Sequence, residues 1–105
     1  RQMCIRDRDY IVHVHAKDML VRSGMNFDPG KGYNLSRGGN YWRGTIFGHG
    51  NVPTFQILSA IRKSGYDGYV SLEFEGMEPV LEGVEIGTQN LQHMIEVIGE
   101  GQRYV

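Results

Sequence analysis

Two short segments of the chain alternate apolar and polar residues with the period of a β-strand, residues 10–16 (YIVHVHA) and residues 69–75 (YVSLEFE). Successive side chains of a strand point to opposite faces. The apolar faces comprise Val12, Val14 and Ala16 in the first segment and Val70, Leu72 and Phe74 in the second. The opposite faces comprise Ile11, His13, His15 and Lys17 in the first and Ser71, Glu73 and Glu75 in the second. The pattern therefore predicts two strands that each bury one face and present polar side chains on the other.

Later in the chain, after each predicted strand, apolar residues recur with the spacing of an α-helix. Residues 53–64 begin with Pro53, which suits the first helical position, and are followed by Gly65, which suits a helix end. Their apolar stripe comprises Phe55, Ile57, Leu58 and Ile61. A second helix is predicted over residues 80–98, with Gly83 and Gly87 weakening its first turns. Its apolar stripe comprises Val84, Leu91, Met94, Ile95 and Ile98.

The order strand, helix, strand, helix predicts a right-handed βαβ crossover with parallel strands. Eight of the 15 glycines lie between Gly24 and Gly50, which predicts a long glycine-rich loop after the first strand. Parallel strands need both faces covered, and barrel strands achieve this with helices outside and polar residues at the inner carboxyl ends.

Composition narrows the class of protein. The 105 residues suit one small domain, carry a net charge of −1 and contain no apolar run near the roughly 20 residues of a membrane span. We therefore expect no membrane insertion and no general nucleic-acid binding. The single cysteine, Cys4, favours a reducing, cytoplasmic setting. Residues 1–9 lack any period and are expected to be a non-native leader, with a native surface segment as the alternative, so the domain is assigned to residues 10–105.

The polar strand faces hold the candidate chemistry. His13 and His15 project from one side of one strand, and Glu73 and Glu75 from one side of the other. Imidazole and carboxylate groups together are suitable ligands for Mn²⁺, Co²⁺, Mg²⁺ or Zn²⁺. Taken alone, the histidines are explained more simply as structural residues, and the two glutamates as residues of a solvated edge strand. Lys17, with the following Asp18, either contacts substrate or forms a local pair.

The motifs HVHAKD, YWRGTIFGHGNVPTF and SAIRKSGYDGYVSLEFE, in this order, resemble the sugar phosphate isomerase/epimerase family with its xylose isomerase-like TIM barrel. The resemblance covers about residues 10–98. It implies an α/β fold that is the C-terminal β-α-β-α portion of a (β/α)8 TIM barrel, about a third of the roughly 250 residues of a complete barrel.

The resemblance also implies roles for individual residues. His15 and Glu73 match metal ligands, and Glu73 also matches an acid/base carboxylate. Expected substrate contacts are His13, Lys17, Arg43, His49 and Glu75. The implied reaction removes a proton beside the carbonyl of a sugar or cyclitol and passes through an enediolate, which a divalent cation stabilises. His49 replaces a glutamate common in relatives, and Gly76 replaces a frequent aspartate.

Several alternatives stay open. An inosose dehydratase of the same family uses the same proton abstraction, a cupin-type barrel also combines H-x-H with later ligands, and the polar faces also suit a non-catalytic binding domain. The family site takes two further carboxylate ligands that have no matching positions here, so we expect weak Mn²⁺ binding and no turnover from the 105 residues alone. A homo-oligomeric full-length protein with a small-molecule substrate is compatible with the sequence.

Overall fold

The polar-faced strands pair in parallel, as predicted. In the computed structural model, which describes residues 13–100, β1 (Val14–Ala16) lies beside β5 (Val70–Leu72), with Val14 opposite Val70 and Ala16 opposite Leu72. Strand β5 is shorter than predicted and His13 lies outside β1, although the Glu73 N–H still donates to the Ala16 carbonyl at 2.9 Å. The beginning of the first predicted strand and the predicted leader over residues 1–9 lie outside the described residues.

Both predicted helices form. Helix α2 (Thr54–Lys63) starts directly after Pro53, and helix α3 (Val80–Glu100) runs two residues beyond its predicted end. Gly65 follows α2 with a φ of 92°, and its N–H donates to the Arg62 carbonyl at 3.0 Å. This left-handed conformation is readily adopted by glycine, which confirms the residue as the end of the helix.

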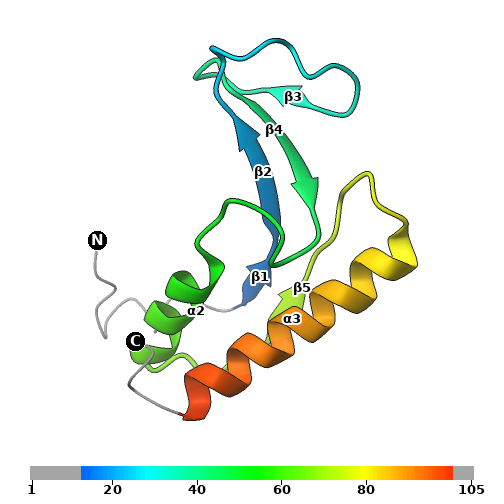
Figure 1. The fold of residues 1–105 in the computed structure, drawn as a ribbon. Coiled ribbons are helices and arrows are strands. Elements are labelled where there is room, and N and C mark those ends of the chain that lie inside the picture. The colour runs from blue at the N-terminus through cyan, green and yellow to red at the C-terminus, as the bar shows by residue number, and fades with distance from the viewer. Residues whose placement is uncertain (1–12, 101–105) are drawn as a thin grey trace.

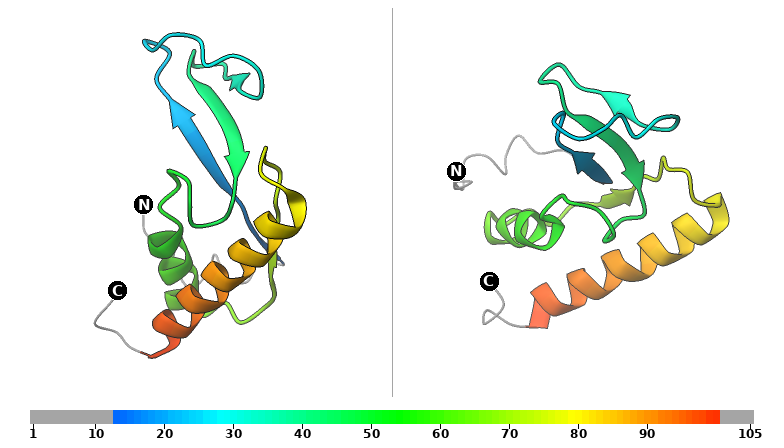
Figure 2. Two further views of the ribbon diagram at one scale, coloured as in Figure 1. Left: turned by 45° about the vertical axis from the view of Figure 1, so that its right-hand side comes forward. Right: turned by 45° about the horizontal axis from the view of Figure 1, so that its top comes forward.

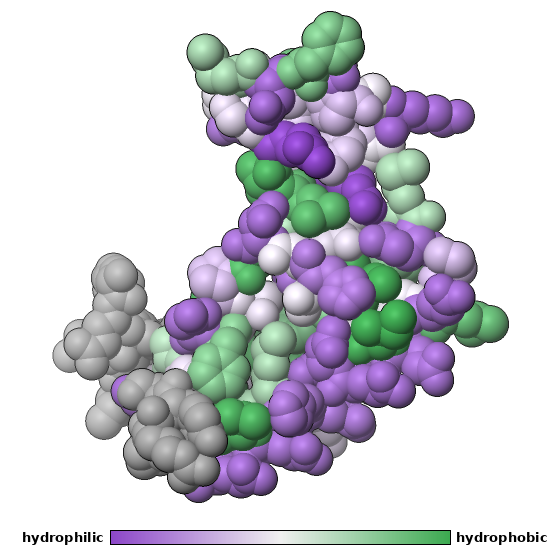
Figure 3. Space-filling model, in the orientation of Figure 1, coloured by the Kyte–Doolittle hydropathy of each residue, from purple (hydrophilic) through white to green (hydrophobic). Residues whose placement is uncertain are grey.

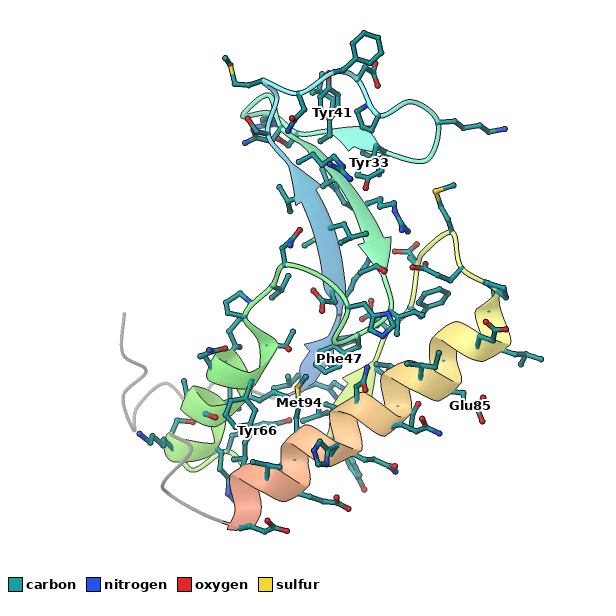
Figure 4. The ribbon with its side chains drawn as sticks, viewed as in Figure 1. Tyr33, Tyr41, Phe47, Tyr66, Glu85 and Met94 are labelled. Carbon is teal, nitrogen blue, oxygen red and sulfur yellow. The ribbon has the colours of Figure 1, made fainter. Side chains whose placement is uncertain are left out.

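The two helices cover the apolar face of the β1–β5 pair, where the core lies. Figure 4 shows Phe47 and Met94 between the helices and the strands. The buried cluster consists of Ala16, Phe47, Leu58, Leu91 and Ile98. Gly83 and Gly87 are buried where α3 approaches β5. A Cβ at Gly83 would lie 2.6 Å from the Phe74 ring, so the glycine that lowers helix propensity is also what allows this close packing.

The prediction of one long loop over residues 24–50 is wrong. The chain forms a three-stranded antiparallel sheet in the order β2 (Asp18–Arg22), β4 (Tyr41–Thr45), β3 (Asn34–Leu35). We call residues 18–45 the arm. Figures 1 and 2 show the arm extending away from the body formed by the helices and the parallel strands.

The strands of the arm have a physical cause that the glycine count hides. Aromatic and β-branched residues, which favour strands, recur in β4, and Val21 of β2 lies opposite Trp42. Gly44 lies inside β4 because a Cβ there would be 1.7 Å from the backbone oxygen of Glu75. Several of the glycines therefore mark turns and close contacts of a sheet and do not indicate an extended loop.

The surface is mixed in character. Figure 3 shows hydrophilic residues spread over the visible face, with hydrophobic residues between them. Within residues 13–100, neither helix combines the length and the apolar character that a membrane crossing requires.

Candidate functional site

Three side-chain contacts cross from β1 to β5 on the polar face and form a ladder. His13 Nε2 lies 2.6 Å from Ser71 Oγ, and His15 Nδ1 contacts Glu73 Oε2. The Lys17 ammonium group, just after β1, donates to Glu75 Oε1 at 2.5 Å. The same diagonal offset recurs at each step because side chains on one face of a strand are two residues apart. The structure thus brings five of the predicted site residues together and adds Ser71.

The His15–Glu73 pair is open to solvent. The side chains are 59% and 43% exposed, respectively, so a small molecule or ion can reach both. The His13 and His15 ring centroids lie 4.9 Å apart, which places two imidazoles beside one carboxylate. Within residues 13–100, no group of three or more His, Cys, Asp or Glu side chains is arranged to hold a metal ion. The described part of the chain therefore offers an imidazole and a carboxylate as a pair of donors.

The arm brings Arg43 to the end of this ladder. The Arg43 guanidinium group donates to the Gly44 carbonyl at 3.1 Å and to Glu78 Oε1 at 3.4 Å, and it lies 5.8 Å from the centroid of the Tyr33 ring. Glu78 also accepts a hydrogen bond of 2.7 Å from the Thr45 hydroxyl. These contacts fix the base of the arm against the segment that follows β5.

The charges of the site influence one another. Burial opposes ionisation of Glu78, but hydrogen bonds from Thr45 and Arg43 outweigh it and hold the pKa of this carboxyl below its usual value. The Lys17 ammonium group, through its hydrogen bond and its charge, lowers the pKa of Glu75. Both carboxylates are therefore ionised at neutral pH.

A pocket of about 410 Å³ opens beside the ladder. It lies between the arm and the segment after β5, and Lys17, Arg43 and Glu75 all line it. Figure 4 shows Tyr33 and Tyr41 farther out on the arm. A hydrogen bond from Arg22, opposed by desolvation and assisted by Arg43, lowers the pKa of the Tyr33 hydroxyl. Three of the predicted substrate contacts thus share one cavity.

Asp18 does not pair with Lys17 and is not available to a ligand. Its side chain is buried and accepts hydrogen bonds from the backbone N–H groups of Gly48 and Gly50, both at 3.0 Å. His49 lies exposed in the turn that these bonds hold, and it is not among the residues that line the 410 Å³ pocket. The structure therefore places His49 apart from the other predicted substrate contacts and makes Asp18 an anchor of the turn.

Sequence reasoning missed Glu78, Thr45 and Trp42. The strand alternation that indicated Glu73 and Glu75 stops at Gly76, so it assigned no face to Glu78. Thr45 and Trp42 lay in the segment predicted as a loop. The strand period of residues 41–45 was the signal that could have identified them.

A comparison with protein-family models supplies an independent finding. Residues 2–98 match the model of the xylose isomerase-like TIM barrel, a family that consists largely of enzymes, isomerases and epimerases among them. Neither the curated proteins nor the solved structures gave a match to the chain. The matched region includes both parallel strands, both helices and the arm, so the α/β structure described above is part of a barrel of this type. The chain belongs to the xylose isomerase-like TIM barrel family.

Proposed function

We propose that this chain contributes the site of a metal-dependent isomerase or epimerase that acts on a sugar or cyclitol. The observation that carries the proposal is the convergence of His15 Nδ1 and Glu73 Oε2 from adjacent parallel strands. His15 lies one residue before the end of β1 and Glu73 directly follows β5, so both lie near the carboxyl ends of the strands, where barrel enzymes of this architecture build their active sites. The family supports the same class of reaction.

The donor chemistry of the pair fits a divalent cation. A neutral imidazole and a carboxylate are ligands for Mn²⁺, Co²⁺, Mg²⁺ and Zn²⁺, and their exposure leaves room for ligands from other parts of a barrel. His15 and Glu73 would hold the ion. When bound, it would supply Lewis-acid stabilisation of the negative charge that develops on a substrate oxygen.

The side chains of the ladder then divide the remaining work. Glu73 has the acid/base role, since a carboxylate can take the carbon-bound proton beside a carbonyl and return it. Delivery of a proton to the opposite face of the same carbon by a second acid, which lies outside this ladder, gives an epimer, and return of the proton to the neighbouring carbon gives an isomer. Lys17 and Glu75, two residues farther along the same face, offer a donor and an acceptor to substrate hydroxyls.

Binding of Mn²⁺ alone to the full chain tests the ligand assignment. His15→Ala and Glu73→Ala should each weaken binding by at least about tenfold, because even residues that only support a metal ligand contribute about 10–100-fold to affinity. Glu85→Ala is the matched control, since Glu85 lies on the exposed side of α3 (Figure 4). Unchanged Mn²⁺ affinity in both ladder variants would favour a non-catalytic domain.

The proton transfer needs its own measurement. In D₂O with Mn²⁺, a complete barrel that contains this chain should exchange the proton at the reacting carbon of a ketose for deuterium, and Glu73→Gln should slow this exchange by about 10²–10⁴-fold, the usual contribution of a general base. Exchange at the same rate in the variant would show that Glu73 is not the acid/base group. Whether Glu73 is a metal ligand is decided separately by the Mn²⁺ binding experiment.

A further inference from the structure

The 410 Å³ pocket lies directly beside the His15–Glu73 pair. Lys17 and Glu75, which line it, are each two residues beyond a member of that pair on the same strand face. Its volume is in the range of small-molecule sites. A substrate whose reacting carbons lie at the pair would therefore place its distal end in this pocket.

Each of the two cations that line the pocket is paired with a carboxylate, of which Glu75 also lines the pocket and Glu78 does not. Lys17 forms an ion pair with Glu75 at 2.5 Å, and Arg43 forms one with Glu78 at 3.4 Å. The Arg43 guanidinium group also donates to a backbone carbonyl and faces an aromatic ring. Sites for phosphate or carboxylate groups instead direct cations or helix N-termini at the ligand. An anion here would have to compete with the carboxylates that already pair with both cations.

The other lining groups suit hydroxyls. Asn34 carries both donors and an acceptor, and the Lys17–Glu75 pair likewise presents a donor beside an acceptor, which matches a hydroxyl that donates and accepts. The Trp42 indole adds a large apolar face, and the ring carbons of a sugar are apolar on one side. The arm therefore supplies both kinds of surface that an uncharged polyol requires.

We propose that the pocket binds an uncharged polyhydroxylated group, so that the substrate is a sugar or cyclitol without a phosphate or carboxylate at its distal end. The proposal rests on the proposed function for the position of the reacting carbons. It concerns the pocket itself, which is formed by the arm and the segment after β5.

Trp42 provides a direct measurement, because it is the single tryptophan of the sequence and it lines the pocket. D-fructose and fructose 6-phosphate are titrated into the full chain while tryptophan emission is followed, with and without Mn²⁺. We expect saturable binding of the uncharged ketose and at least about tenfold weaker binding of the ester. Glu75→Gln with Glu78→Gln should reverse this preference by releasing two cations for the phosphate.

A control variant with two substitutions changes the net charge by the same amount as the Glu75/Glu78 variant. Glu85→Gln with Glu96→Gln removes two exposed carboxylates of α3 and should leave the preference as in the unchanged chain. The proposal is overturned if the ester binds the unchanged chain as tightly as the ketose, or if neither sugar changes the emission. An unchanged preference in the Glu75/Glu78 variant would overturn it as well. Loss of Mn²⁺ binding in the His15 variant is measured separately, so failure of the metal assignment does not decide this result.

Discussion

The buried carboxylate of Asp18 allows a quantitative prediction. Only 1% of the residue is exposed, and its two oxygens accept four backbone N–H groups. Oδ1 accepts those of Met19 and Val52 at 2.8 and 3.2 Å, and Oδ2 accepts those of Gly48 and Gly50 at 3.0 Å. In Asp18→Asn, one oxygen becomes an NH₂ group that cannot accept, so two donors, which are partly buried against the side chain, lose their partner in either orientation of the amide.

The size of the effect follows from this count. An unsatisfied buried donor costs about 1–3 kcal/mol, so two cost about 2–6 kcal/mol. Because these donors are only partly buried, we expect a loss in the lower part of this range, about 3 kcal/mol in the free energy of unfolding. With a urea dependence of about 1–3 kcal/mol per M, the unfolding midpoint should fall by about 1–3 M. Amide hydrogen exchange should accelerate first at Gly48, Gly50 and Val52, because these are the donors that depend on Asp18.

Asp28→Asn is the matched control. Asp28 is exposed and accepts a single N–H group, that of Gly30 at 2.8 Å, so the same chemical change should alter the free energy of unfolding by less than about 0.5 kcal/mol. The reasoning is refuted if Asp18→Asn leaves both the urea midpoint and the exchange of the turn amides as they are in the unchanged chain, or if the two variants lose equal stability.

Three further predictions concern the arm and the ladder. Gly44→Ala should destabilise the chain by about 1–3 kcal/mol in urea unfolding, because its Cβ would lie 1.7 Å from the Glu75 backbone oxygen, whereas Gly38→Ala, whose Cβ would lie 3.9 Å from its nearest neighbour, should not. The pKa of Glu78 is lowered in the folded chain, so its contribution to stability is present above the usual pKa of 4.5 and is lost as the pH falls through the lower folded value. In thermal melts, the melting temperature of Glu78→Gln should therefore fall less steeply at acid pH than that of the unchanged chain. An identical fall in both proteins would contradict the role given to Glu78. Lys17→Met should raise the pKa of Glu75 toward its ordinary value in an NMR titration. An unchanged Glu75 pKa in this variant would show that the ion pair does not form in solution.

The strand faces were predictable because alternation is a local property. His15 and Glu73 each follow from their own segment, and the predicted parallel crossover brings the two segments side by side. The helix over residues 53–64 was predictable for a similar reason, since Pro53 and Gly65 bound an apolar stripe of the right period. The sequence alone therefore predicted the features that depend on the spacing of apolar residues and on the residues that begin and end a helix.

The remaining features depend on contacts between distant segments. Asp18 is buried because a turn 30 residues later folds over it, and no spacing near Asp18 indicates that turn. Lys17 pairs with Glu75 instead of with its neighbour because the strand pairing brings that carboxylate within reach. The arm was missed because its glycines resemble loop glycines in the sequence, and only the approach of Gly44 to Glu75 explains why one lies inside a strand.

The ladder across β1 and β5 also identifies one alignment of the two strands. A slip of two residues would keep the polar side chains on the same face but would move the diagonal contact of His15 from Glu73 to Ser71 or Glu75. A slip of one would turn apolar residues toward the site. A misaligned intermediate would therefore possess native-like helices and strands and still lack the imidazole–carboxylate pair. Recovery of that pair during refolding reports the correct alignment of these strands, which secondary-structure spectra alone do not detect.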